Sequence, residues 1–270
     1  MSESATKTVS ESVKRSAAVK AAAPSNVVSV ASGKGGVGKT WLAITLAHAI
    51  SASGQSCLLF DGDLGLANVD VQLGLDPVRD LATAVATEQA LHEIAVPVPD
   101  TGFHVVAGRS GSGGLAAMAA GQIDQLGKSL RTLAQRYDRV VLDLGAGIDR
   151  TVRTLAGHAG VGLVVTNDEP TALTDAYAYI KVVKRQRPDA DLRIVVNMAA
   201  NQREGERTYA TLRKACENFL RVTPPLLGVV RRDDRVRESI RHQCPLLTRY
   251  PNADAAADVH ALARRLLDAG

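Results

Sequence analysis

The stretch GKGGVGKT at residues 33–40 decides the fold, because it fits the pattern G-x-x-x-x-G-K-[ST] without a mismatch. It follows a short apolar run, NVVSVAS at 26–32, and it precedes helical spacing over residues 38–52. A strand, a glycine-rich turn and a helix in this order place successive backbone N–H groups around phosphate oxygens. A plain glycine-rich turn is the alternative, and it leaves the complete motif in this context unexplained.

The rest of the chain continues the alternation of strand and helix that the phosphate loop begins. This alternation predicts an α/β fold: a doubly wound, mostly parallel sheet with helices on both faces, as in P-loop NTPases. In such a sheet the loops that follow the strands share one edge. Strands are expected at 26–32, 56–61, 103–108, 139–144, 161–166, 192–198 and 226–230. Helices are expected at 38–52, 121–137, 171–186, 204–220, 234–242 and 253–268.

Composition predicts one ordered domain behind a short tail. The chain has 270 residues, of which 46% are hydrophobic and only 3% aromatic, so the core must consist mainly of Ala, Val, Leu and Ile. Residues 1–25 are rich in Ser, Ala and Lys and show little apolar periodicity, which is typical of a disordered or weakly ordered tail. We therefore expect a single P-loop ATPase domain over residues 26–270.

Cysteine usage and charge indicate the compartment and limit the partners. The three cysteines show no metal-ligand spacing, and no apolar run is long enough to span a membrane, which predicts a cytoplasmic protein with at most peripheral membrane contact. The net charge of +4 favours a solvated surface over a nucleic-acid patch. The reason is that no tight Lys/Arg block with interleaved aromatic residues is present.

Each polar residue of the phosphate loop has a predicted task. Lys39 is expected to bridge the β- and γ-phosphates of a nucleotide, and Thr40 to offer its hydroxyl to Mg²⁺. Lys34 has two interpretations: a cation that reaches the nucleotide of a facing subunit, or an exposed loop lysine. Asn197, at a strand end, either reads an adenine edge or forms a turn. The predicted nucleotide-binding residues are Gly33, Lys34, Gly35, Gly36, Val37, Gly38, Lys39, Thr40, Trp41 and Asn197.

Carboxylates follow two of the predicted strands at the edge where the phosphate loop also lies. Asp61 and Asp63 end the strand at 56–61, and Asp143 ends the strand at 139–144. A Mg²⁺–nucleotide site needs acidic groups that hold the metal through water and orient the attacking water. Asp143 and Asp61 are the candidates for holding the metal, and Asp63 is the candidate for orienting the attacking water. Each alone is better explained as a turn-capping aspartate, but three beside a phosphate loop favour the site.

The sequence resembles the MinD/ParA family of deviant Walker A ATPases. KGGVGKT followed by FDGDLGLANVDVQLGL carries the resemblance, which covers about residues 26–250. Three stretches are most similar to the flagellar-number regulators FlhG and FleN. They are DGDLGLANVD (61–70), DLGAGI (143–148) and EPTALTDAYAYIK (169–181).

The resemblance implies roles that the spacing alone leaves open. Lys34 matches the signature lysine that contacts the partner subunit's nucleotide, and Asp63 matches the aspartate that activates water. Asp61 and Asp143 match Mg²⁺-associated positions, and Asn197 matches an adenine-contacting asparagine. ATP with Mg²⁺ would then drive a face-to-face homodimer, and slow hydrolysis would release it. Lys34, Lys39 and Asp63 would be the catalytic residues, and the dimer would recruit a protein partner of the flagellar or polar machinery.

Some features depart from the family pattern or leave two interpretations. Arg231 stands where the family usually has a proline near the adenine, and the tail lacks the DQAxxLR-type element of FlhG proteins. Residues 255–268 form either a membrane-surface helix or a helix docked on the sheet, and the small apolar face favours docking.

Two rival functions remain beside the flagellar switch. A ParA-like DNA-segregation ATPase would bind non-specific DNA through a basic patch. A scaffold would bind ATP without turnover. The candidate patch for DNA is Arg231, Arg232, Arg235, Arg237 and Arg241.

Overall fold

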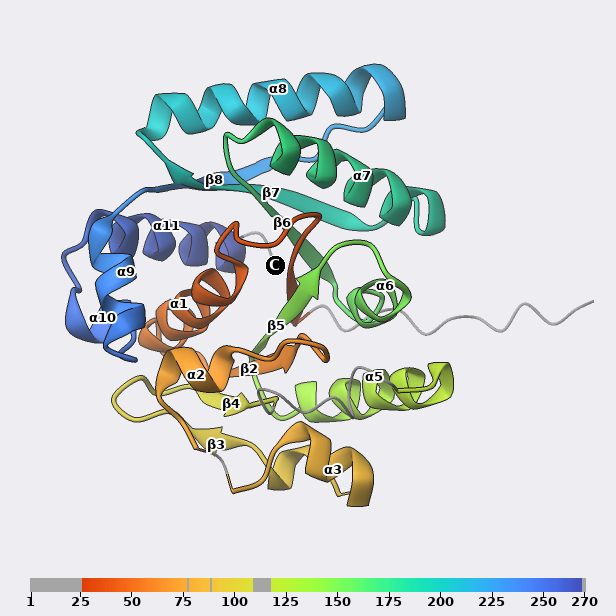
Figure 1. Ribbon diagram of the computed structural model, residues 1–270, viewed down its shortest axis with the longest axis vertical. Helices are drawn as coiled ribbons and strands as arrows, with labels where there is room; N and C mark the ends of the chain where they lie inside the picture. The colour runs from red at the N-terminus through yellow and green to blue at the C-terminus, as the bar shows by residue number, and fades with distance from the viewer. Residues whose placement is uncertain (1–25, 77, 88, 109–117, 269–270) are drawn as a thin grey trace, which may run out of the picture.

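The computed structural model describes residues 26–76, 78–87, 89–108 and 118–268 (Figure 1). The tail predicted at 1–25 lies outside these residues. The strands are β1 (Val27–Ser32), β2 (Cys57–Gly62), β3 (Val96–Pro97), β4 (His104–Val106), β5 (Arg139–Ala146), β6 (Val161–Thr166), β7 (Asp191–Ala199) and β8 (Leu226–Arg231). The helices are α1 (Lys39–Ala52), α2 (Val69–Leu73), α3 (Leu81–Thr87), η1 (Leu91–Glu93), α5 (Ala120–Ala134), α6 (Arg150–Ala156), α7 (Pro170–Gln186), α8 (Gln202–Leu220), α9 (Asp234–Arg241), α10 (Leu246–Arg249) and α11 (Asp254–Asp268).

One eight-stranded sheet forms the centre of the molecule, in the order β3-β4-β2-β5-β1-β6-β7-β8. Every pair of neighbours is parallel except β3 and β4, so the predicted mostly parallel, doubly wound sheet is confirmed. β1 lies between β5 and β6, and the chain moves to one side of it for β2 and to the other side for β6. Ligands of open α/β sheets bind where the strand order reverses in this way.

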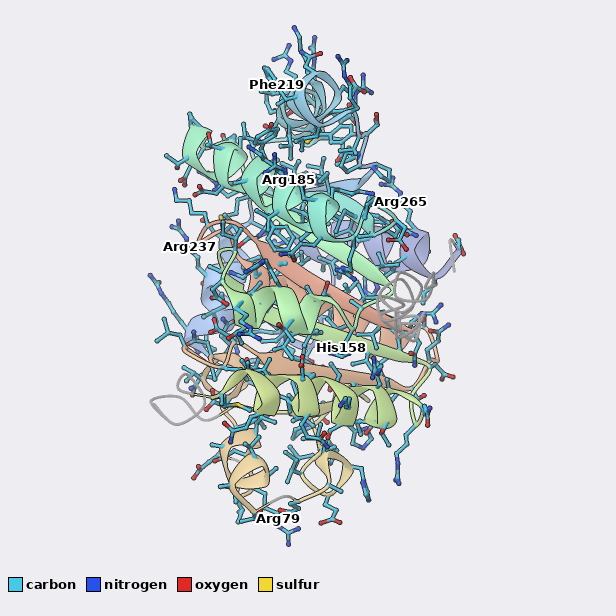
Figure 2. The ribbon with its side chains drawn as sticks, turned by 90° about the vertical axis from the view of Figure 1, so that its right-hand side faces the viewer. Arg79, His158, Arg185, Phe219, Arg237 and Arg265 are labelled. Atoms are coloured by element: carbon cyan, nitrogen blue, oxygen red, sulfur yellow. The ribbon has the colours of Figure 1, made fainter. Side chains whose placement is uncertain are left out.

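The two faces of the sheet carry separate cores because side chains alternate along each strand. Val27 and Ala31 of β1 point into one core, together with apolar residues of α5, α6, α7 and α8. Val28 and Val30 point into the other, with α1, α2, α10 and α11. Figure 1 shows these two groups of helices on opposite sides of the sheet, and Figure 2 looks onto the side of α5, α6 and α7.

The predicted long elements are all present, whereas α2, α3, η1, α6, α10 and β3 were not predicted. These elements have two to seven residues, which is too short for a hydrophobic period to develop. The C-terminal helix docks, as favoured: Val259, Leu262 and Leu266 are buried, and α11 packs against α1 and β8. Within the described residues, no helix has the length and apolarity required to cross a bilayer.

Candidate nucleotide-binding site

A cavity of about 740 Å³ opens at the carboxyl ends of β1, β2 and β5, and we call it the P-loop cavity. The phosphate loop and the first residues of α1 line one side of it. The loop after β2 and the turn into α6 line the other. Its lining residues are Gly35, Gly36, Gly38, Lys39, Thr40, Trp41, Gly62, Asp63, Leu64, Gly65, Leu66, Asn68, Gln72, Gly145, Ala146, Asp149, Thr151, Val152, Met198 and Ile240.

Close packing behind the phosphate loop explains two of its glycines. A Cβ on Gly33 would lie 2.1 Å from the backbone oxygen of Asp175 in α7. Gly38 has a φ of +84°, and a Cβ there would lie 2.5 Å from Nδ2 of Asn197. The hydroxyl of Ser32 donates to the carbonyl oxygen of Lys34 at 2.6 Å and closes the turn. The loop is therefore fixed from behind, with its open side toward the P-loop cavity.

Lys39 and Thr40 begin α1 and lie beside the buried Asp143, which stands within β5, three residues before its end. Burial lowers the pKa of Lys39, while the carboxylates of Asp143 and Asp63 oppose this shift. Burial raises the pKa of Asp143, and the nearby carboxyl of Asp61 raises it further, against a hydrogen bond from Thr40. The site thus brings a buried lysine and buried carboxyls together, and the added charge of a triphosphate would favour the protonated form of Lys39.

Asp61 and Asp63 organise the loop that follows β2. Asp61 accepts hydrogen bonds from the backbone N–H groups of Asp63 at 3.2 Å and Val69 at 3.3 Å. Asp63 accepts from the N–H of Leu66 at 3.0 Å and itself lines the P-loop cavity. Burial raises the pKa of Asp61 to about 7. Asp63 therefore faces the cavity, whereas Asp61 lies behind it and pairs in register with Asp143.

The residues present fit a Mg²⁺ ion that arrives with phosphates. Oδ1 of Asp143 is buried and has no hydrogen-bond partner within the described residues, so an acceptor remains for a metal-bound water. Mg²⁺ keeps several waters and uses one or two carboxylates together with substrate phosphates, so a single open carboxylate oxygen suits it. The described residues contain no group of three His, Cys, Asp or Glu side chains that could hold a metal ion.

Lys34 points away from the P-loop cavity, toward the start of α7. Its Nζ donates to Oε2 of Glu169 at 2.5 Å and to Oγ1 of Thr171 at 2.8 Å. The hydrogen bond and charge of Lys34 lower the pKa of Glu169. Asn167 forms the turn before α7 by accepting from the N–H of Glu169 at 3.2 Å. In the single chain Lys34 is therefore occupied by two side chains of the EPTALTDAYAYIK stretch.

The remaining predicted residues have structural contacts. Asn197 lies within β7 rather than in a turn, and its Nδ2 donates to the carbonyl oxygen of Val37 at 2.8 Å. Trp41 is buried and lines the P-loop cavity. Arg231 forms ion pairs with Asp254 at 3.0 Å and Asp258 at 2.9 Å, which join β8 to α11. Arg231 is therefore neither part of the cavity lining nor a free cation for the predicted DNA patch.

Sequence reasoning did not find several residues that line the cavity. Thr151 and Val152 belong to the unpredicted α6, and Asp149 caps its start. Met198 comes from β7 and Ile240 from α9. Ile240 belongs to α9, which was predicted, but nothing in its spacing indicates a cavity. The DLGAGI resemblance at 143–148 was the one signal that pointed toward the start of α6.

Comparisons with known proteins agree with this geometry. Residues 28–246 match the family model "CobQ/CobB/MinD/ParA nucleotide binding domain". The chain is 35% identical to the antiactivator FleN of Pseudomonas aeruginosa, over 90% of this chain and 86% of that protein. It is 31% identical to the flagellum site-determining protein YlxH of Helicobacter pylori, over 83% of this chain and 76% of that protein.

A solved structure shares the fold. It is the septum site-determining protein MinD of Pyrococcus horikoshii, complexed with Mg-ADP, with a TM-score of 0.77 and 23% identity. The match covers 90% of this chain and 96% of that one. The matched family region contains the whole phosphate loop and the three carboxylates around it. The chain therefore belongs to the CobQ/CobB/MinD/ParA nucleotide-binding family.

Proposed function

We propose that this chain is an ATP-driven dimerisation switch that hydrolyses ATP slowly and regulates flagellar number or placement. The observation that carries the ATPase part is the P-loop cavity, in which Lys39, Thr40 and Asp63 converge at the sheet edge beside the buried Asp143. Support for the flagellar part is the 35% identity to FleN over most of both chains. The Mg-ADP complex of the MinD structure supports an adenine nucleotide with Mg²⁺.

In this proposal the loop amides and Lys39 bind the phosphates. Asp63 orients the attacking water from the rim of the cavity, where its carboxylate is already held by the N–H of Leu66. Thr40, Asp143 and Asp61 would hold Mg²⁺, which would supply neutralisation of the phosphate charge. Asn197 acts behind the loop, where its bond to Val37 keeps the turn in shape.

Lys34 acts across the interface of a face-to-face homodimer. It leaves Glu169 and Thr171 and reaches the nucleotide of the other subunit, where its charge stabilises the transferred phosphoryl group as an arginine finger does. The ATP-bound dimer then presents a surface to a partner protein of the flagellar or polar machinery. The protein is cytoplasmic in this proposal, with any membrane contact peripheral.

The test uses the chain's single tryptophan as a reporter, because Trp41 is buried in the wall of the P-loop cavity. Mg-ATP should change the intrinsic fluorescence and bind in calorimetry. Lys39→Ala should lose both signals, whereas the matched surface variant Lys214→Ala on α8 should keep them. Asp63→Ala should retain binding and lose phosphate release, which separates a switch from a scaffold. If calorimetry detects no magnesium-dependent affinity for adenine nucleotides, the proposal is wrong.

The flagellar role has a separate test. Expression of this chain in Pseudomonas aeruginosa lacking FleN should change the number of flagella counted by electron microscopy, and Lys39→Ala should not. An unchanged count with the wild-type chain, at matched expression, argues against the flagellar role and leaves the ATPase role intact.

A further inference from the structure

A second cavity, of about 650 Å³, lies between α5, α6 and the end of α7, on the face that Figure 2 shows. We call it the basic groove. One acidic side chain, Asp124, lines it against five cationic ones: Lys128, Arg131, Arg150, Arg153 and Arg187. In the described part of the chain, no ion pair joins any of the five to a carboxylate. Uncompensated charge of one sign in a concave site attracts ligands of the opposite sign.

Two of the guanidinium groups are held in place by backbone oxygens. Arg187 donates to the carbonyl oxygens of Ala156 at 3.1 Å and Gly157 at 3.4 Å, at the end of α6. Arg153 donates to the carbonyl oxygen of Asp149 at 3.2 Å, at the start of α6. A guanidinium fixed in this way loses little freedom when it binds a carboxylate with its remaining N–H groups.

A glycine on α5 makes room for an imidazole that lines the groove. A Cβ on Gly127 would lie 2.0 Å from Nε2 of His158, so the imidazole occupies the space that a larger residue would fill. Figure 2 labels His158 where α5 and α6 meet. The helices therefore approach closely at His158, and the cations stand around that contact.

The chemistry of the groove favours acidic side chains over other anions. Lys128 and Arg131 on α5, and Arg150 and Arg153 on α6, are each one helical turn apart, as are acidic residues on one face of a helical peptide. Its described lining contains no Phe, Tyr or Trp on which bases would stack. The chain's own first 25 residues have the wrong charge, with two acidic residues against four basic ones: Glu3 and Glu11 against Lys7, Lys14, Arg15 and Lys20. We propose that the basic groove binds an acidic segment of a partner protein.

The groove and the P-loop cavity share α6 as a common wall. Asp149, Thr151 and Val152 line the P-loop cavity, whereas Arg153 and its neighbours line the groove. The guanidinium of Arg153, on the groove side, donates to the backbone carbonyl of Asp149, which lines the P-loop cavity. If nucleotide binding moves α6, it would move the cations of the groove, and by linkage an acidic ligand would then change nucleotide affinity by the same factor. This coupling rests on the proposed function, while the groove's affinity for acidic peptide does not.

Binding is tested by fluorescence anisotropy with a fluorescein-labelled oligoglutamate peptide and the full chain. The wild type should bind saturably, and the charge reversal Lys128→Glu with Arg131→Glu should weaken binding by about tenfold or more. The matched control reverses two cations on α8, Arg203→Glu with Lys214→Glu, and should retain the affinity within about twofold. The proposal is overturned if the two double variants lose the same amount of peptide affinity, or if the wild type does not bind the peptide. Circular dichroism verifies that each variant is folded.

Competition and nucleotide dependence complete the test. The competitors are a single-stranded oligonucleotide and phosphatidylglycerol vesicles, each compared with unlabelled peptide at equal concentrations of negative charge. If either competitor displaces the labelled peptide at a lower concentration than the unlabelled peptide does, the choice of a protein partner is overturned. The peptide Kd for Asp63→Ala should differ by about fivefold or more with and without Mg-ATP, and equal values overturn the coupling. If the peptide binds but calorimetry detects no nucleotide, the proposed function fails and the groove stands.

Discussion

Single residues at the nucleotide site were predictable to different degrees. The phosphate loop and the carboxylates near the carboxyl ends of β2 and β5 follow from motif and strand position, because parallel strands bring their carboxyl ends to one edge. The contact of Lys34 with Glu169 and Thr171 could not be predicted in this way. The lysine and Glu169 are 135 residues apart in the sequence, and no local pattern indicates that they meet. The bond from Asn197 to Val37 was equally hidden, because it depends on β7 lying behind the loop.

The ion pair of Lys34 with Glu169 leads to a prediction about dimer formation. Glu169→Gln removes the charge that retains Lys34 within its own chain, so ATP-dependent dimerisation should tighten by up to about fivefold, as expected for an exposed pair. Sedimentation with Mg-ATP in the Asp63→Ala background measures the dimer Kd. Glu206→Gln on α8 is the matched control. If Glu169→Gln dimerises more weakly than the wild type, the prediction is wrong and the dimer requires the ion pair between Lys34 and Glu169.

The buried carboxyl of Asp61 leads to a prediction about pH. Burial raises its pKa to about 7, so the folded chain keeps a proton that the unfolded chain loses near pH 4. Stability contributed by this group therefore falls as pH rises from about 4 to about 7. Asp61→Asn removes this titration. As pH rises from about 4 to about 7, the Tm of the nucleotide-free variant should therefore increase relative to the Tm of the wild type. Parallel Tm curves would contradict the burial of a titrating carboxyl.

Helices and strands were predicted where they are long and regular, and missed where they are short. The most important helix that the sequence did not predict is α6, with seven residues, because it separates the P-loop cavity from the basic groove. Its start is marked by Asp149, whose side chain accepts from the N–H of Val152 at 2.9 Å. That capping pattern is visible in the sequence, but similar aspartates occur in many turns, so it does not identify a helix alone.

The contact between α8 and β8 leads to a prediction about a helical glycine. A Cβ on Gly205 would lie 2.3 Å from Cγ1 of Val229, so Gly205→Ala should lower the free energy of unfolding by about 1–3 kcal/mol despite better helix propensity. Gly121→Ala on α5 meets nothing within 4 Å and should raise it by up to about 1 kcal/mol. Urea denaturation measures both. A stabilised Gly205→Ala would mean that α8 shifts at little cost.

The doubly wound sheet was predictable because the alternation of strand and helix is regular and the core residues are small and branched. The antiparallel β3 was not, since two residues including a proline give no strand pattern. Docking of α11 was favoured from its small apolar face, and the burial of Val259 and Leu262 agrees.

The molecule as a whole should change its assembly with nucleotide. Around the P-loop cavity, Leu66 and Ile148 expose 74% and 42% of their surface, an apolar area suited to a second copy. Asp63→Ala with Mg-ATP should sediment at twice the monomer mass, and with Mg-ADP at the monomer mass. Leu66→Lys should prevent the doubling, while Phe219→Lys, at the far end of α8, should not. A monomer under all conditions would contradict the switch.

The helix that begins at the phosphate loop is enclosed by the sheet on one side and by α11 on another. From Trp41 to Ile50 every residue of α1 is buried. Such a helix offers almost no neutral positions, so random substitution should be tolerated far less along α1 than along α8, whose outer face meets water. Drift between distant relatives should therefore leave α1 as one of the slowest-changing segments, for reasons of space as much as of chemistry.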